Sequence, residues 1–281
     1  MPQRFDGRFM ARAVWGRVAT AAVALCLMAV SVVACGSSDD DATYTEQPVE
    51  VLYNRALDAL GRQEYKAAAK GFEEVDRQHP YSVWATKAQL MAAFSYYEMN
   101  KYDEAIGALD RFIQLHPGHR DIPYAYYLKA LCYYEQISDV QRDQRVAQQA
   151  LDALAEVVKR FPESPYARDA RLKVELVIDH LAGKEMAIGR FYQSNYQYIG
   201  AINRYRVVIE RYQTTTPVPE ALHRLVECYL ALGVRHEAQE AAAVLGYNFP
   251  GSDWYQDSYF LMTGEGTRPP DERRGWFFGL F

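Results

Sequence analysis

Side chains that could ligate a metal are few and scattered along this chain. The closest spacing among the six histidines is His116-Pro117-Gly118-His119. A protein metal site usually needs three or four ligands held on one scaffold. This pair straddles a proline that ends a helix, and no cysteine or carboxylate cluster accompanies it. We therefore expect no metal. His79 and His116 both directly precede a proline, which predicts a place at a helix C-terminus.

The motifs of common enzyme classes are also missing. The sequence contains no glycine-rich phosphate loop, no Gly-x-Ser-x-Gly nucleophile turn and no His-Glu-x-x-His. We predict no catalytic residues and no cofactor, and hence a protein that is not an enzyme. The formal net charge of −5 also argues against a general nucleic-acid binder, which needs a basic surface to meet phosphates.

Cys35 is the residue with a predicted covalent modification. Four arginines in the first 17 residues precede an apolar, uncharged run, which ends in Val32-Val33-Ala34-Cys35. This order resembles the signal peptide and lipobox of bacterial lipoproteins. The resemblance implies that residues 1–34 are removed and that Cys35 carries lipid. Since the removed part holds four arginines and one aspartate, the mature chain would have a net charge near −8.

The residues after Cys35 help to predict in which membrane the protein is anchored. In lipoproteins an aspartate next to the cysteine favours retention in the inner membrane, so Gly36 implies the periplasmic face of the outer membrane. Residues 35–48 are polar and aperiodic, which predicts a lipidated flexible tether. The alternative is an uncleaved transmembrane anchor, although 17 apolar residues are at the short limit for crossing a bilayer.

A ladder of one small and two large apolar residues recurs five times in the rest of the chain. Ala105, Leu109 and Phe112 are spaced four and then three, so they share one face of a helix that Pro117 ends. The same spacing recurs in four other segments: Ala68, Phe72 and Val75; Ala150, Leu154 and Val157; Ala201, Tyr205 and Val208; Ala238, Ala242 and Leu245. Five copies with fixed internal spacing indicate a repeat protein.

Each repeat is predicted to be a pair of helices. In the second copy the expected helices are residues 89–99 and 102–115, and small residues followed by an aromatic one are typical of tetratricopeptide repeats. Turns of the form Pro-x-Ser-x-aromatic start at Pro80, Pro162 and Pro250. In each of them the proline ends one helix and the serine can cap the next. We predict an all-α tetratricopeptide-repeat solenoid of five helix pairs.

The distances between the key alanines are uneven, at 37, 45, 51 and 37 residues. The spacing of 45 residues, from Ala105 to Ala150, contains a polar insertion at residues 138–145. The spacing of 51 residues, from Ala150 to Ala201, contains residues 166–192, which stay periodic and predict one long helix between repeats three and four. The predicted divisions are N-terminal repeats 1–3 over residues 49–165, and the long helix with C-terminal repeats 4–5 over residues 166–262.

Two cysteines, Cys132 and Cys228, lie in the predicted repeats. They occupy equivalent places in repeats three and five, too far apart for a disulfide even in an oxidising compartment. We predict buried free thiols.

Tyrosine pairs occur on the first helices of repeats two and three, at positions 96, 97, 126, 127, 133 and 134. Adjacent residues point in different directions, so about half would be core and the rest would line a groove suited to a peptide. Residues 263–281 form a predicted flexible tail with an aromatic end, Trp276 to Phe281. One interpretation of this end is a disordered apolar tip without a specific role. The other is a docking peptide or a membrane-surface contact.

Taken together, these features resemble the BamD family, the tetratricopeptide lipoproteins of the outer-membrane β-barrel assembly machine. Three local stretches carry the resemblance: Asp110-Arg111-Phe112-Ile113, continuing to Leu115 and Pro117; Asp179-x-Leu181-Ala182; and Asn203-Arg204. The similarity covers about residues 45–250, and the C-terminal tail departs from the family pattern.

The resemblance implies a non-catalytic scaffold with several partners. These are the POTRA domains of the barrel component BamA, other Bam lipoproteins and unfolded outer-membrane β-barrel proteins. Arg204 matches a family arginine that docks on the POTRA domains, and its fork of donors suits a carboxylate. Lys66, His79 and Tyr81 match first-repeat positions of a substrate cleft, although His79 stands where an aromatic residue is expected. The simpler interpretation of Arg204 is a surface salt bridge.

A second hypothesis is a periplasmic tetratricopeptide adaptor lipoprotein that recruits cell-wall, or peptidoglycan, enzymes. It shares the lipidation signal and the repeats. It does not require the long helix or the Asp110–Ile113 stretch.

Overall fold

The computed structural model describes residues 46–139 and 144–264. They form eleven α-helices: α2 (Val49–Gly61), α3 (Tyr65–Gln78), α4 (Val83–Glu98), α5 (Tyr102–Leu115), α6 (Ile122–Glu135), α7 (Arg145–Arg160), α8 (Pro165–Ser194), α9 (Tyr198–Arg211), α10 (Val218–Ala231), α11 (Arg235–Asn248) and α12 (Asp253–Thr263). The described part contains no strand, and none of its helices has both the length and the apolar character needed to cross a bilayer.

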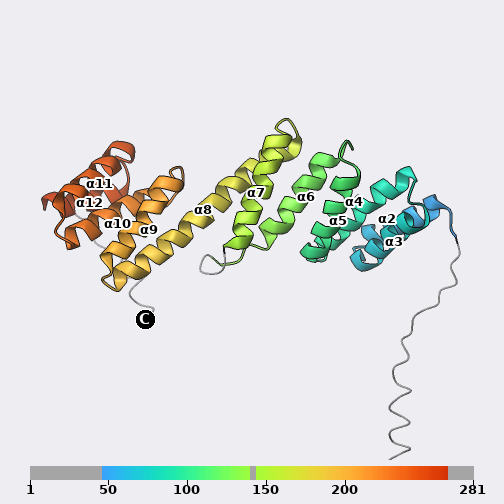
Figure 1. The fold of residues 1–281 in the computed structure, drawn as a ribbon, viewed down its shortest axis with the longest axis horizontal. Coiled ribbons are helices and arrows are strands. Elements are labelled where there is room, and N and C mark those ends of the chain that lie inside the picture. Colours follow the sequence, from blue (N-terminus) through green and yellow to red (C-terminus); the bar gives the residue numbers. More distant parts are fainter. Residues whose placement is uncertain (1–45, 140–143, 265–281) are drawn as a thin grey trace, which may run out of the picture. The chain divides into compact units, whose positions relative to one another are not determined.

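Successive helices pack against one another as pairs (Figure 1). The pairs are α2 with α3, α4 with α5, α6 with α7, the C-terminal part of α8 with α9, and α10 with α11, and α12 covers the last pair. The prediction of an all-α fold of five tetratricopeptide-type pairs is confirmed. The predicted helix at 102–115 matches α5, whereas α4 starts six residues before its predicted start because Ser82 caps it.

The apolar ladder forms the core of the repeats. Ala105, Leu109 and Phe112 are fully buried, as are their counterparts in α3, α7 and α9. In α11, Ala238 and Leu245 are fully buried and Ala242 is half-buried. The ladder therefore sets the stacking of the helices, and function must lie on the remaining faces.

The serine in each Pro-x-Ser-x-aromatic turn caps the helix that follows. The hydroxyls of Ser82, Ser164 and Ser252 accept hydrogen bonds from the backbone N–H groups of Ala85, Ala167 and Tyr255 at 3.0, 3.2 and 3.2 Å. Each serine satisfies one of the N–H groups that a helix start leaves without an intrahelical partner. The repeated motif is therefore a helix-start signal.

Replacing Ser164 by alanine is expected to lower the free energy of unfolding by about 1 kcal/mol, because the first turn of α8 loses its cap. Urea denaturation followed by circular dichroism measures this. Ser194→Ala is the control: this serine bonds a carbonyl at the other end of α8, and its loss should change stability by less than about 0.5 kcal/mol. Equal losses for both variants would contradict the capping role.

Helix α8 is continuous over 30 residues, as the periodicity predicted, and it belongs to two cores. Val177 and Leu181 pack in the core of α6 and α7, whereas Ala182 and Met186 pack in the core of α9 to α11. Gly189 permits the second contact, because a Cβ there would lie 2.4 Å from the ring of buried Tyr205. The helix therefore joins the third repeat to the fourth.

Several predicted segments lie outside the described residues. These are the signal peptide with Cys35, the tether up to residue 45, residues 140–143 of the insertion, and the tail from residue 265.

Candidate docking surfaces

Arg204 lies on α9 and is held by a carboxylate of the neighbouring helix. Its Nη1 donates a hydrogen bond to Glu185 Oε2 of α8 at 3.1 Å. The arginine side chain is 41 % exposed and the glutamate 20 %. The salt bridge of the simpler interpretation therefore exists, and the arginine side chain is still partly exposed to solvent. A guanidinium that one carboxylate already orients can bind a second carboxylate with little further loss of side-chain entropy.

Large apolar side chains are exposed close by in sequence, around the turn from α8 to α9. Phe191, Tyr196 and Ile199 are 65, 79 and 69 % exposed. Tyr196 has a positive φ of 60° in this turn, and its ring contacts that of Tyr198. Exposed aromatic and aliphatic groups are typical of protein interfaces. Sequence reasoning missed them, because isolated apolar residues near a turn have no distinguishing spacing.

A polar network joins α8, α10 and α12. Glu227 of α10 accepts hydrogen bonds from Arg224 at 2.7 Å and from Gln193 of α8 at 2.8 Å, and it lies 3.4 Å from His223. His223 also bonds the buried hydroxyl of Ser258 in α12 at 2.8 Å. Burial raises the pKa of Glu227, but His223 and Arg224 outweigh it and hold that pKa at about 2. The network ties α8, α10 and α12 together, and sequence reasoning missed it as well.

The three substrate-cleft candidates do not form one cluster. Tyr81 lies fully exposed in the turn after α3. His79, at the C-terminal end of α3, places its Nε2 2.7 Å from the carbonyl oxygen of Gln47. Lys66 lies at the other end of the same helix, about 20 Å along its axis. Tyr81 and His79 are thus neighbours, while Lys66 belongs to a separate depression with Lys70 and Met99.

All six paired tyrosines are half-buried, so none is wholly core and none stands free. Tyr127 illustrates this, because its hydroxyl donates to Asp169 of α8 while its ring stacks on Tyr166. Burial and Asp169 raise the pKa of Tyr127. Part of the hydrogen-bonding capacity of this tyrosine surface is therefore used within the protein.

The other two family-like stretches also make contacts between helices. Asp110 accepts a hydrogen bond from Lys129 of α6 at 2.6 Å. Asp179 accepts from the N–H and the hydroxyl of Thr216, each at 3.1 Å, which holds the turn before α10 against α8. These aspartates stabilise helix contacts.

The two closely spaced histidines are engaged with protein groups. His116 Nε2 lies 3.0 Å from Gln89 Oε1, and His119 Nδ1 accepts from the N–H of Asp121 at 3.2 Å. Within the described residues no group of three metal-ligating side chains comes together.

Cys132 and Cys228 are buried free thiols, as predicted. Burial raises the pKa of each thiol to about 12, so the thiolate is scarce at neutral pH. We expect both to resist iodoacetamide at pH 8 in the folded protein and to react fully in 6 M guanidinium, as measured by mass spectrometry. Rapid labelling without denaturant would contradict their burial.

Comparisons with known proteins identify relatives of this chain. A family profile described as an outer membrane lipoprotein, YfiO, matches residues 45–245. The outer membrane protein assembly factor BamD of Caulobacter vibrioides is 52 % identical over 265 residues, covering 94 % of this chain and 87 % of the relative. That of Rickettsia prowazekii is 46 % identical, covering 80 and 90 %. The TPR2AB domain of yeast Sti1 aligns at 11 % identity over 76 % of this chain and 82 % of that one, with a TM-score of 0.41.

Both sequence relatives exceed 30 % identity over most of this chain, and the profile spans more than half of it. The prediction of a non-catalytic outer-membrane assembly scaffold is confirmed, and the family match favours it over the cell-wall adaptor. The chain belongs to the YfiO/BamD family of outer membrane lipoproteins, the outer membrane protein assembly factors.

Proposed function

We propose that this assembly factor docks on the POTRA domains of BamA through its C-terminal repeats and receives unfolded outer-membrane β-barrel proteins on its N-terminal repeats. Other Bam lipoproteins would share the complex, and lipid on Cys35 would anchor it. The observation that carries the docking proposal is the partly exposed side chain of Arg204, oriented by Glu185.

The surface around Arg204 supports this choice. Glu185 supplies one carboxylate and leaves donors of the arginine free for a partner's carboxylate. Phe191, Tyr196 and Ile199 provide apolar area on the adjoining turn. The network around Glu227 keeps α8 and α10 in a fixed relation, which reduces the entropy lost on docking.

For substrate, Tyr81 is the strongest of the three candidates. Its ring is fully exposed at the turn between the first two repeats, where it can contact an extended chain. The neighbouring His79 already contacts the carbonyl oxygen of Gln47 through its Nε2. We therefore assign His79 the role of fixing the start of the folded part of the chain. Lys66 lies too far along α3 to share a contact with Tyr81.

Co-purification from detergent-solubilised envelopes with mass spectrometry tests docking. We expect the wild type to recover BamA and Arg204→Glu to recover at least tenfold less, because a new carboxylate would face both Glu185 and the partner. The control is Arg206→Glu, the same charge change on α9 at an exposed arginine that pairs with Glu210 on its own helix. Full recovery by Arg204→Glu would remove Arg204 from the interface.

Lipidation is tested by growth with a clickable fatty acid. The wild type should be labelled and Cys35→Ala should not. An unlabelled wild type would disprove the anchor.

A further inference from the structure

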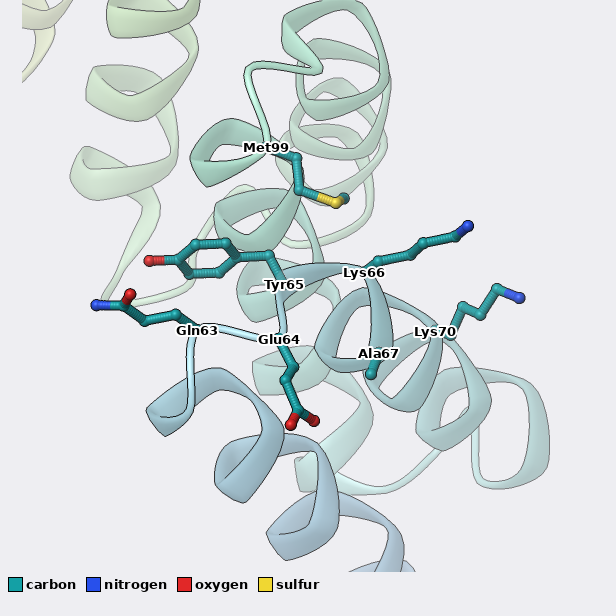
Figure 2. Close-up of a pocket in the computed structure, with 7 residues that line it drawn as sticks. All are labelled: Gln63, Glu64, Tyr65, Lys66, Ala67, Lys70 and Met99. Atoms are coloured by element: carbon teal, nitrogen blue, oxygen red, sulfur yellow. The ribbon is translucent and has the colours of Figure 1, made fainter.

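Two lysines on α3 lie close together without an ion-pair partner among the described residues. Lys66 and Lys70 are one helical turn apart, and both are exposed. Their amino groups extend to the same side of the helix (Figure 2). Neither forms an ion pair with any residue in 46–139 or 144–264.

Their placement is electrostatically unfavourable for the isolated protein. Like charges four residues apart on a helix repel, and cations near a helix start meet the positive end of its dipole. The first turn of α3 contains no acidic residue, whereas α5, the corresponding helix of the second repeat, has Asp103 and Glu104 there. The first repeat therefore lacks the acidic residues that the second repeat has at the start of this helix, and this difference favours the binding of an external anion.

The acidic side chains near the lysines are already engaged. Glu64 accepts from Arg62 at 3.2 and 3.3 Å. Glu73 accepts from the hydroxyl of Tyr96, and Glu74 from Arg77. None of these carboxylates forms an ion pair with Lys66 or Lys70, so both amino groups are available to an external anion.

A largely apolar depression of about 610 Å³ lies beside these amino groups, and Ala67 and Met99 contribute to its lining. Glu64 also lines it, but its carboxylate accepts hydrogen bonds from Arg62. Figure 2 shows Met99 on the side of α3 from which Lys66 extends. Lysine stems and a thioether offer apolar, adaptable surface below charged heads. The combination fits an anion joined to an apolar group.

The same helix fixes the point where the chain leaves for its membrane anchor. The N–H of Gln47 donates to Gln78 Oε1 at 3.0 Å, and His79 Nε2 lies 2.7 Å from the Gln47 carbonyl oxygen. Cys35 lies twelve residues earlier, a length that spans at most roughly 40 Å. An anchored chain therefore holds the C-terminal end of α3 within roughly 40 Å of the lipid headgroups.

We propose that Lys66 and Lys70 bind the phosphate of an anionic phospholipid in the leaflet that holds the anchor, with its glycerol and upper acyl carbons against Ala67 and Met99. The clamp on Gln47 at the C-terminal end of α3 and the lysine pair, about 12–18 Å away along the helix axis, then set the orientation of the first repeat on the membrane. This rests on the proposed lipidation of Cys35 and is independent of the docking role of Arg204.

The test uses the full lipidated protein in nanodiscs of phosphatidylcholine alone or with 30 % phosphatidylglycerol. Amine-reactive labelling, read by mass spectrometry, should slow at least threefold at Lys66 and Lys70 when the anionic lipid is present. Lys159 of α7, also exposed and without an ion pair among the described residues, is the internal control and should not change. Equal labelling in both nanodiscs would overturn the proposal.

Charge-reversal variants separate lipid binding at the lysine pair from a general response of the protein to anions. Amide hydrogen exchange in α3 should be slowed by phosphatidylglycerol in the wild type and in Lys159→Glu, but not in Lys66→Glu/Lys70→Glu. Equal protection by 10 mM inorganic phosphate, or by a free-carboxylate peptide in phosphatidylcholine nanodiscs, would overturn the membrane assignment. Failure to enter nanodiscs would instead disprove the anchor at Cys35.

Discussion

Replacing Phe112 by alanine is expected to lower the free energy of unfolding by about 3–5 kcal/mol. Phe112 is fully buried and packs with Leu109 and Leu128 in the core that joins the second and third repeats. Its removal deletes apolar contacts and leaves a cavity that the two helix pairs cannot close without moving apart. Urea denaturation followed by circular dichroism measures the loss.

Leu115→Ala on the same helix is the matched control. This leucine is 59 % exposed, so its truncation should cost less than about 0.5 kcal/mol. If both variants lost the same stability, the Ala105–Leu109–Phe112 ladder would not be the core of the repeat.

The second large effect concerns pH. Above about pH 5, the ionised Glu227 stabilises the fold through Arg224, Gln193 and His223. Its folded pKa of about 2 lies below the ordinary 4.5. The stabilisation is therefore complete above the unfolded pKa and is lost as pH falls from about 5 to 2. A depression of this size corresponds to about 3 kcal/mol.

Glu227→Gln should therefore be less stable than the wild type by about 2–3 kcal/mol at pH 7, with the difference shrinking toward zero near pH 2. Denaturation curves at several pH values measure it. Glu156→Gln is the control, because Glu156 makes a surface ion pair with Arg160 and is 41 % exposed. A pH-independent difference for Glu227→Gln would contradict the linkage.

Local sequence rules account for much of the fold. The ladder of Ala105, Leu109 and Phe112 predicts both helical phase and burial, because a period of 3.6 residues leaves one face for the core. The length of α8 followed from periodicity that continued across Gly183. The start of α4 was placed six residues too late, although its first turn is apolar, with Ala85 fully buried; the Ser82 cap marks it.

The functional surfaces were less predictable. Arg204 could be named from family resemblance, but its partner Glu185 lies 19 residues away on another helix. The contacts of Glu227 and the clamp of His79 on Gln47 join segments whose approach depends on the angles between helices. Spacing within one helix cannot supply those angles.

The most direct measurement of the docking proposal is site-specific photocrosslinking in living cells. A photoreactive residue at Asn203, exposed beside Arg204 on α9, should crosslink to BamA, and the same probe at Lys159 on α7 should not. The crosslink should weaken at least tenfold in the Arg204→Glu background. Equal BamA crosslinks from both positions, or none from Asn203, would contradict docking through the C-terminal repeats.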